Sequence, residues 1–469
     1  MLFSSIPFLY YFLPLVLAVY FLTPRAGKNA VLFLSSLLFY AWGEPKFCIF
    51  MLLSILQGYV FGRLIEKHAQ NKKRSKLFLT ASVALSLALL AYCKYADFFL
   101  SSVNAVTGLS FKLLHVTLPI GISFYTFQIL SYVVDVYRGS VPAQKSFLKL
   151  GTYIAMFPQL IAGPIVRYAE IAPQLDSRQT TLEDVSSGAC RFVIGLSKKV
   201  LLANVLYELI TAFQQSRDLS VLYFWLYAVS FALQLYFDFS GYSDMAIGLG
   251  RIFGFRFQEN FNYPYISGSI TEFWRRWHIS LGSWFKEYLY FPLGGSRTGT
   301  LRTLRNLLLV WLATGLWHGA SWNYVLWGLY FGVLICLEKL LAPHFRAHPR
   351  KGLLAGLYRP VCLLLAVLGW VLFRAEDLPA AGRYFACLFG GAAGVSAQAR
   401  LYLHDFWPVL LLGAVGATPL CAKLAGRLGA KLRPGVRAAV QAVLVLALLA
   451  CSTVWLLNGS FQSFVYFQF

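Results

Sequence analysis

Long apolar runs recur from one end of the chain to the other, and they limit its fold more than any other feature. Of the 469 residues, 58% are hydrophobic and only 13% are charged. A water-soluble core of this size could not bury so many apolar side chains. Because helices satisfy their own backbone hydrogen bonds within a bilayer, the sequence predicts an all-α polytopic membrane protein.

The apolar runs supply thirteen candidate membrane spans. Several are shorter than the roughly 20 residues that a straight crossing needs, so we expect about 10 to 13 crossings together with re-entrant or interfacial helices. The first run has no basic segment ahead of it, and we expect no cleavable signal peptide. The spans are residues 7–22, 30–42, 47–64, 77–92, 118–136, 152–166, 192–213, 219–237, 306–318, 322–337, 353–373, 407–424 and 438–457.

The formal net charge is +22, from 41 Lys and Arg residues against 19 Asp and Glu residues. Such a charge suggests nucleic acid in a soluble protein, but the basic runs lack interleaved aromatic residues that would stack on bases. The positive-inside rule accounts for the charge, because basic residues gather in alternate connections. If these connections face the cytoplasm, both termini lie outside, with the region 138–199 left open. The basic clusters are residues 25–28, 63–76, 297–305, 346–351 and 423–437.

Motifs typical of several soluble enzyme classes are missing from the sequence. There is no HExxH motif, no Walker A loop and no GxSxG elbow, which removes the usual grounds for a metalloprotease, an ATPase or a serine hydrolase. The eight cysteines form no CxxC pair and lie mostly in apolar runs, so we expect neither a disulfide framework nor a metal site. No internal repeat is evident, which weakens the case for an inverted-repeat transporter.

Two histidines with tryptophan neighbours are the strongest candidates for a reaction centre. His278 lies in TEFWRRWHISLGSWFKEYLYF, residues 271–291, and His318 follows in NLLLVWLATGLWHGASWNYVLWGLYFG. Titratable side chains are costly inside a membrane and usually functional there. Apolar residues of the first segment recur at helical spacing, so we predict one interfacial or re-entrant helix over residues 271–291, with His278 on its inward apolar face.

The position of His318 can be estimated from length. If Arg305 marks the cytoplasmic surface, thirteen residues of helix rise about 20 Å into a hydrocarbon layer of about 30 Å. The helix should then break at Gly319. Desolvation lowers the pKa of an imidazole at this depth, and the neutral ring can act as a general base toward a hydroxyl. Alternatively, each histidine only hydrogen-bonds a carbonyl between packed helices.

Six further residues are weaker candidates for binding a substrate or donor. Two arginines could hold an anionic group, or pair with Glu272 or Glu287 at the interface. Two tryptophans are more simply explained as interface anchors or packing residues. Two aspartates, separated by an expected Gly-containing helix break, could line a cavity, although structural pairing with an arginine is favoured. The six are Arg275, Arg276, Trp277, Trp317, Asp238 and Asp244.

At these residues the chain resembles the membrane-bound O-acyltransferase (MBOAT) superfamily, and within it the bacterial alginate O-acetylation branch. The resemblance covers nearly the whole chain, although after about Arg374 it extends to hydropathy alone. It is specific in its combination of segments: MLFSSIPFLYYFLPLVLAVYFL, LPIGISFYTFQILSYVVDVYRG, FPQLIAGPIVRY, QLYFDFSGYSDMAIGLGRIFGFRFQENFNYPY, FWRRWHISLGSWFKEYLYFPLGG and WHGASWNYVLWG.

The resemblance implies a helix bundle around a central tunnel, in one integral membrane domain. It divides residues 1–469 into N-terminal helices (1–150), a catalytic core (151–340) and C-terminal helices (341–469). It places the superfamily's essential histidine at His318 and its second polar position at His278. It implies acyl transfer to a hydroxyl with acetyl-CoA as the donor and no bound cofactor or metal, in the inner (plasma) membrane of a bacterium.

The branch further implies O-acetylation of an exported polysaccharide such as alginate, completed by an extracytoplasmic SGNH-type acetyltransferase, with membrane lipid and no nucleic acid as other partners. We expect His318 to act as the base, and His278 to orient the acyl group or stabilise developing charge. A sister branch that transfers D-alanine toward teichoic acids shares the WRRWHIS-like segment and stays an alternative. A proton-coupled polysaccharide or lipid transporter is the alternative of a different class.

Overall fold

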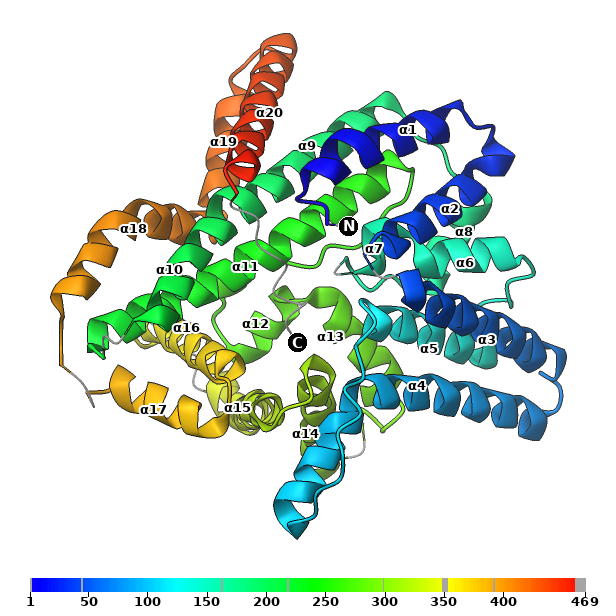
Figure 1. Ribbon diagram of the computed structural model, residues 1–469, viewed down its shortest axis with the longest axis horizontal. Coiled ribbons are helices and arrows are strands. Elements are labelled where there is room, and N and C mark those ends of the chain that lie inside the picture. The colour runs from blue at the N-terminus through cyan, green and yellow to red at the C-terminus, as the bar shows by residue number, and fades with distance from the viewer. Residues whose placement is uncertain are drawn as a thin grey trace. The chain divides into compact units, whose positions relative to one another are not determined.

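The structure is a computed structural model that describes residues 2–43, 45–161, 163–216, 219–297, 299–347, 353–390 and 393–459. Over these residues the chain forms helices and loops and no strand, which confirms the predicted all-α class (Figure 1). The chain divides into two compact units, Met1–Phe192 with Ser243–Gln258 and Val193–Tyr242 with Glu259–Phe469. The expected subdivision at residues 150 and 340 stays a prediction.

Three helices pack side by side in the first unit: α3 (Cys48–Lys67), α4 (Lys72–Thr107) and α5 (Ile122–Arg138) (Figure 1). Gly62 lets α3 approach α5 closely, because a Cβ here would overlap the ring of Tyr132. The other elements are η1 (Phe8–Phe12), α1 (Leu13–Leu22), η2 (Arg25–Gly27), α2 (Lys28–Ala41), η3 (Pro45–Phe47), α6 (Phe147–Ala155), α7 (Phe157–Leu160), α8 (Tyr168–Asp176) and α9 (Leu182–Ser197), which continues past Phe192.

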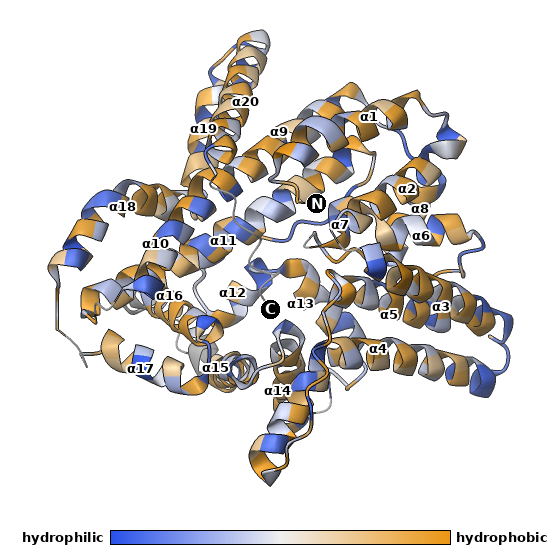
Figure 2. Cartoon of the chain, in the orientation of Figure 1, coloured by the Kyte–Doolittle hydropathy of each residue, from blue (hydrophilic) through white to orange (hydrophobic). Residues whose placement is uncertain are grey.

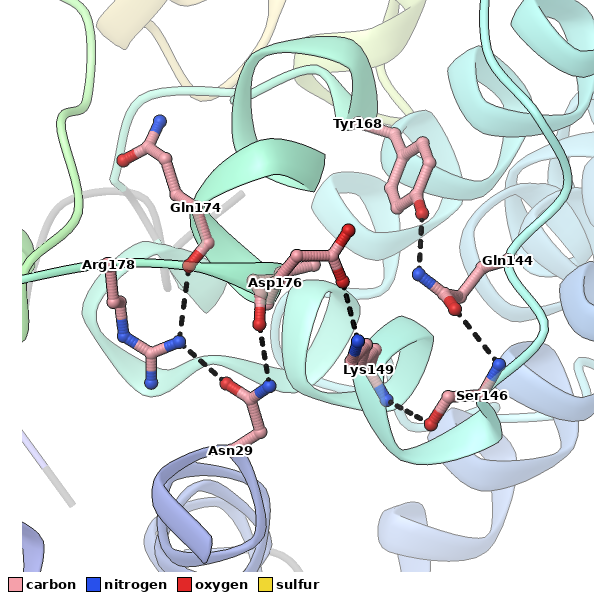
Figure 3. A network of polar contacts seen from close by, with 9 residues as sticks. Asn29, Gln144, Ser146, Lys149, Tyr168, Gln174, Asp176 and Arg178 are labelled. Carbon is pink, nitrogen blue, oxygen red and sulfur yellow. Dashed lines mark hydrogen bonds and ion pairs between the residues drawn. The ribbon is translucent and has the colours of Figure 1, made fainter. Parts of the chain in front are cut away.

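Polar contacts tie α2, α6 and α8 of the first unit together, as Figure 3 shows. The Arg178 guanidinium donates to Oδ1 of Asn29 at 2.7 Å, and Nδ2 of the same asparagine donates to the carbonyl of Leu175 at 2.9 Å. Lys149 of α6 pairs with Asp176 at the end of α8, at 2.5 Å. Asn29 is buried, so the two hydrogen bonds to its amide satisfy polar atoms that would otherwise be costly to bury.

The second unit contains both histidines that the sequence singled out. Its longest helices are α11 (Val221–Ile252), whose residues up to Tyr242 belong to this unit, and α15 (Trp322–Ala347). The remaining elements are η4 (Lys198–Ala203), α10 (Asn204–Gln215), η5 (Pro264–Ile266), α12 (Ile270–Arg276), α13 (Ile279–Phe285), η6 (Lys286–Tyr290), α14 (Thr300–His318), α16 (Leu353–Arg374), α17 (Leu378–Leu388), α18 (Ala397–Gly416), α19 (Leu420–Ala430) and α20 (Pro434–Leu457).

Helices α14 and α15 form a hairpin whose two backbones touch. A Cβ at Gly315 would overlap the carbonyl oxygen of Tyr324, and a Cβ at Gly328 would overlap that of Trp311. Small residues that let backbones approach in this way are typical of helix pairs within membranes. The hairpin fixes the position of His318, because this histidine is the last residue of α14 and Gly319 follows in an extended conformation.

The predicted spans agree with the longer helices of the structure. Judged by length and apolar composition, five helices of the described residues could cross a membrane, or six if the bent pair α18 and α19 counts as one. Figure 2 shows mainly hydrophobic residues along α3 and α4 and hydrophilic residues at the connection between them. The five are Pro45–Lys67, Lys72–Thr107, Val221–Ile252, Trp322–Ala342 and Pro434–Leu457. The total of about 10 to 13 crossings stays a prediction.

Two of the predicted spans are not continuous helices. Residues 152–166 contain the end of α6, the short α7 and a loop, because Pro158 cannot donate the backbone hydrogen bond that would continue a helix. Residues 407–424 bend by 72° between α18 and α19, where Pro419 has the same effect. Hydropathy alone ran across both breaks, although each segment contains a proline at its break.

The expected helix break between Asp238 and Asp244 is also wrong, since α11 runs unbroken from Val221 to Ile252. Its Gly241 serves close packing instead, because a Cβ there would overlap the carbonyl of Gly195. In the second unit, Asp238 pairs with Lys199 at 2.5 Å, and both side chains are less than 5% exposed.

The first unit contains the matching pair of Asp244 with Arg191, at 2.8 Å. Each aspartate therefore has the structural pairing that the sequence favoured, one of them with a lysine. Asp135 and Arg138 of α5 form a third pair, at 4.0 Å.

The Lys199–Asp238 pair yields a test of the fold. We expect Asp238→Ala to lower the free energy of unfolding by about 3–5 kcal/mol, because the substitution leaves a buried lysine charge without its partner. Thermal unfolding of the detergent-purified protein, followed by size-exclusion chromatography, measures the effect. The control is Asp176→Ala, which removes a more exposed partner of Lys149 and should change stability little. Equal small losses in both variants would contradict the assigned role.

Candidate active site

The segment 271–291 is not one helix, contrary to the prediction, because it is interrupted at His278. Helix α12 ends at Arg276, and α13 begins at Ile279. Between them His278 has φ +46° and ψ +54°, a left-handed conformation that is uncommon for residues other than glycine. The new helix start is held by Asn260, whose main-chain oxygen accepts from Ile279 N at 3.0 Å.

The His278 ring is buried among uncharged neighbours. It is 2% exposed, its Nδ1 lies 3.2 Å from Oδ1 of Asn260, and it packs nearly perpendicular to the Phe239 ring at 4.7 Å between centroids. His278 lies outside the helices long enough to cross a membrane. Burial lowers the pKa of His278 from 6.5 to about 3, because the charged ring would lose its hydration. The imidazole is therefore neutral at any physiological pH.

His318 is enclosed by aromatic rings at the end of α14. It is 7% exposed, and its ring centroid lies 4.9 Å from Trp317, 4.8 Å from Trp327 and 5.2 Å from Phe373. The Trp317 indole also lies 6.1 Å from the His278 ring. The structure thus brings the two predicted catalytic histidines, 40 positions apart in sequence, to the same indole.

A cavity of about 910 Å³ in the second unit extends to His278, and His318 is not among its lining residues. Helices α12 to α15 and Tyr358 of α16 form its walls. Its inner wall is largely apolar and aromatic, with Trp274, Trp277, Ile279, Leu281, Phe285, Leu307, Val310, Trp311 and Ile335. Its exposed cations are Arg275, Lys286 and Lys339. The cavity can therefore take a molecule with an anionic end and a smaller group that reaches a buried imidazole.

The two predicted donor-binding arginines have different surroundings. Arg275 lines the cavity and is exposed. Arg276 instead pairs with Glu272 at 2.8 Å and donates to the carbonyl of Asn262 at 3.1 Å, which is the alternative that the sequence left open for it. Only the first of the two faces the space where a donor could bind.

The tryptophans and aspartates among the candidates also differ in whether they line the cavity. Trp277 contributes to the cavity wall while its ring packs on Trp370 at 4.7 Å, so it combines lining with packing. Trp317 is buried and lies against both histidines. Neither Asp238 nor Asp244 lines the cavity, and their ion pairs account for their burial.

Two residues of the site were not predicted from the sequence. Asn260 is 1% exposed and contacts both the His278 ring and the start of α13. Glu338 of α15 accepts four hydrogen bonds: from Ile270 N, Thr271 N, Thr271 Oγ1 and Tyr358 OH. A carboxylate directly after an apolar run was a visible signal for Glu338. For Asn260, no local pattern in QENFNYPY points to His278.

Residues 35–358 match the sequence profile of MBOAT, the membrane-bound O-acyltransferase family. The chain is 44% identical over 397 residues to the probable alginate O-acetylase AlgI of Pseudomonas putida, covering 83% of this chain and 80% of that protein. It is 35% identical to the peptidoglycan O-acetyltransferase of Helicobacter pylori, over 81% of this chain and 78% of that one. The teichoic acid D-alanyltransferase of Bacillus subtilis is 30% identical over 46% of this chain and 58% of its own length.

Glu338 yields a test of how the cavity wall is held. We expect Glu338→Ala to lower the free energy of unfolding by about 1–2 kcal/mol, because the first N–H groups of α12 lose the acceptor that caps them. Glu338→Gln, which keeps one carbonyl oxygen, should lose less. Tyr358→Phe is the control, since it removes a single one of the four hydrogen bonds. Thermal unfolding of the purified variants gives the order of their stabilities. Wild-type stability in Glu338→Ala would refute the capping role.

Proposed function

The chain belongs to the membrane-bound O-acyltransferase family, and we propose that it moves an acetyl group from acetyl-CoA in the cytoplasm to hydroxyls of an exported polysaccharide such as alginate. The names of its relatives support this substrate class, because both alginate and peptidoglycan are extracellular glycans. The chain aligns with most of the length of those two proteins, so the proposal concerns the whole reaction.

The cavity between the exposed cations and His278 is the observation that carries the proposal. Arg275, Lys286 and Lys339 give it a positive rim, which suits the phosphate groups of a coenzyme A thioester. Its apolar inner part suits the pantetheine arm and the acetyl group. Cys336 of α15 lies 3.7 Å from the carbonyl of Leu304, so Lys339 lies near the start of α14. That end carries the basic cluster 297–305, which the positive-inside rule assigns to the cytoplasm.

The reaction needs a base on the acceptor side and stabilisation of charge on the donor side. In the proposed step, the acceptor hydroxyl loses its proton to His318 as its oxygen attacks the thioester carbonyl, a new C–O ester bond forms and the C–S bond breaks. The proton then passes to the departing thiolate. His278 orients the reacting groups or stabilises developing charge. The aromatic enclosure of both rings supports this assignment, because it excludes water from them.

Partners and orientation follow from the same proposal. An extracytoplasmic SGNH-type acetyltransferase completes transfer to the polysaccharide, and the chain lies in the inner membrane of a bacterium with both termini outside. D-alanyl transfer to teichoic acid is the less supported alternative, because the D-alanyltransferase relative aligns with less than half of this chain. A proton-coupled transporter would use the same histidines as relay groups.

His318 provides the direct test of acyl transfer. In a deletion strain complemented with His318→Ala, we expect ester-linked acetate on the extracellular polymer to fall at least about 100-fold, because general-base catalysis contributes about 10²–10⁴ in rate. Mass spectrometry of the purified polymer measures it. His404→Ala is the control, since His404 is exposed and outside the cavity. Retained acetate in the deletion strain itself would refute polymer acetylation, and lost polymer export would favour the transporter.

The two arginines separate donor binding from structural pairing. We expect Arg275→Ala to raise the KM for acetyl-CoA about tenfold with kcat little changed, because one charge-assisted contact to a phosphate is lost. Arg276→Ala should leave this KM within about twofold, because its guanidinium is engaged by Glu272. Free thiol released from acetyl-CoA by membranes of a polymer-producing strain gives both constants. An unchanged KM in both variants would remove the donor-binding role.

A further inference from the structure

Asn260 makes an unusual set of contacts around His278. Its side-chain oxygen Oδ1 accepts from the backbone N–H of Ser280 at 3.1 Å and from the Ser280 hydroxyl at 2.9 Å. The same oxygen lies 3.2 Å from Nδ1 of His278. All three residues are at most 2% exposed, so water does not compete for these contacts.

These contacts determine where the His278 proton is. A backbone N–H can only donate, so the Asn260 atom that faces Ser280 N must be the oxygen and not the amide nitrogen. That oxygen can only accept, and Nδ1 of His278 beside it must therefore carry a hydrogen. A neutral imidazole has one N–H, so the lone pair of the ring lies on Nε2.

We infer that Asn260 is a positioning residue which holds His278 as its Nδ1-protonated tautomer and so makes Nε2 a hydrogen-bond acceptor toward the substrate. The inference rests on the proposed function, and it decides between the two roles left open for His278. A neutral ring with no hydrogen on Nε2 cannot donate to a developing oxyanion. It can accept from an amide N–H of the pantetheine arm of the thioester, and in this way orient the acyl group for attack.

The backbone supports the same arrangement. The left-handed conformation of His278 directs Ile279 N and Ser280 N toward Asn260, which binds one through its main chain and the other through its side chain. A strained residue at a cavity persists only when its surroundings hold it in place. Removal of Asn260 would therefore disturb both the ring and the helix start, and the test needs a substitution that keeps the helix start.

Asn260→Asp meets this requirement, because a carboxylate can still accept from Ser280. It also places a negative charge beside Nδ1, which favours the protonated ring and raises its pKa. The aromatic neighbours of the ring, Phe239 and Trp317, carry no charge. Charged groups on the elements around the ring include Arg275, Lys286, Glu338 and Lys339 of the cavity. The others are the Glu272–Arg276 pair of α12, Glu259 beside Asn260, Glu287 of η6 and the Lys199–Asp238 pair; all are the same in both proteins.

The experiment compares pH profiles of thiol release from acetyl-CoA, with membranes of a polymer-producing deletion strain that expresses wild type, Asn260→Asp, Asn260→Ala or His278→Ala. We expect the acid limb of the Asn260→Asp profile to lie at least about one pH unit above that of wild type, because protonated His278 cannot accept a hydrogen bond. Asn260→Ala should lose at least about tenfold in kcat with donor KM little changed. The matched control is Asn262→Asp, which adds the same charge two residues away at an exposed position.

The outcomes separate the two proposals. A shifted acid limb in Asn260→Asp alone, with normal protein levels and an inactive His278→Ala, supports the inference. Superimposable profiles of Asn260→Asp, Asn262→Asp and wild type, with His278→Ala inactive, overturn the positioning role and leave acyl transfer standing. Full activity in His278→Ala overturns both the role of this ring and the inference about it.

Discussion

A polar group buried in this chain has to find its partner within the protein, because neither lipid nor an aromatic core can supply one. In the second unit, buried polar groups find partners within the protein at three places. Lys199 and Asp238 neutralise each other on η4 and α11, Glu338 collects four donors at the start of α12, and Asn260 collects the donors around His278. Each of these contacts joins elements far apart in sequence, so the polar groups fix the register of the helices that carry the site.

Close packing completes what the polar contacts begin. The glycines of α14 and α15 bring the two backbones together, and the space beside them is filled by tryptophan. Trp274, Trp327 and Trp370 pack with ring centroids 5.5 to 6.0 Å apart, at separations where aromatic pairs add about 0.5–1.5 kcal/mol each beyond their buried area. A wall built of large rigid rings holds the histidines in fixed positions, because few alternative rotamers fit a core packed at this density.

Hydropathy predicted the class of the protein, most of α3, α11, α15 and α20 and a shorter part of α4, because a long apolar run has few ways to be satisfied except as a helix. It failed at residues 271–291. Apolar residues do recur there at helical spacing. However, Asn260, which lies 18 positions before His278, offers oxygen acceptors that the segment can reach only if its helix is broken at His278. Spacing along one segment carries no information about such a partner.

The site residues show the same limit. Glu272 lies four positions before Arg276, so this pairing could be read from the sequence, and it was among the alternatives. The position of Arg275 on the cavity depends instead on how α12 packs against α15, which the sequence does not show. Both histidines were identified because titratable residues among apolar ones are rare. Their common contact, Trp317, was assigned to packing, since a tryptophan next to a histidine looks the same in sequence whether or not a second histidine reaches it.

The arrangement around Trp317 constrains how the proposed reaction can proceed. The cavity reaches His278 and not His318, so a donor that enters past the exposed cations meets the first ring and not the second. A base at His318 has to act on an acceptor that arrives by another path, and the reacting carbonyl must then lie within about 3–3.5 Å of the attacking oxygen. With both rings packed on one indole, that meeting point lies beside Trp317.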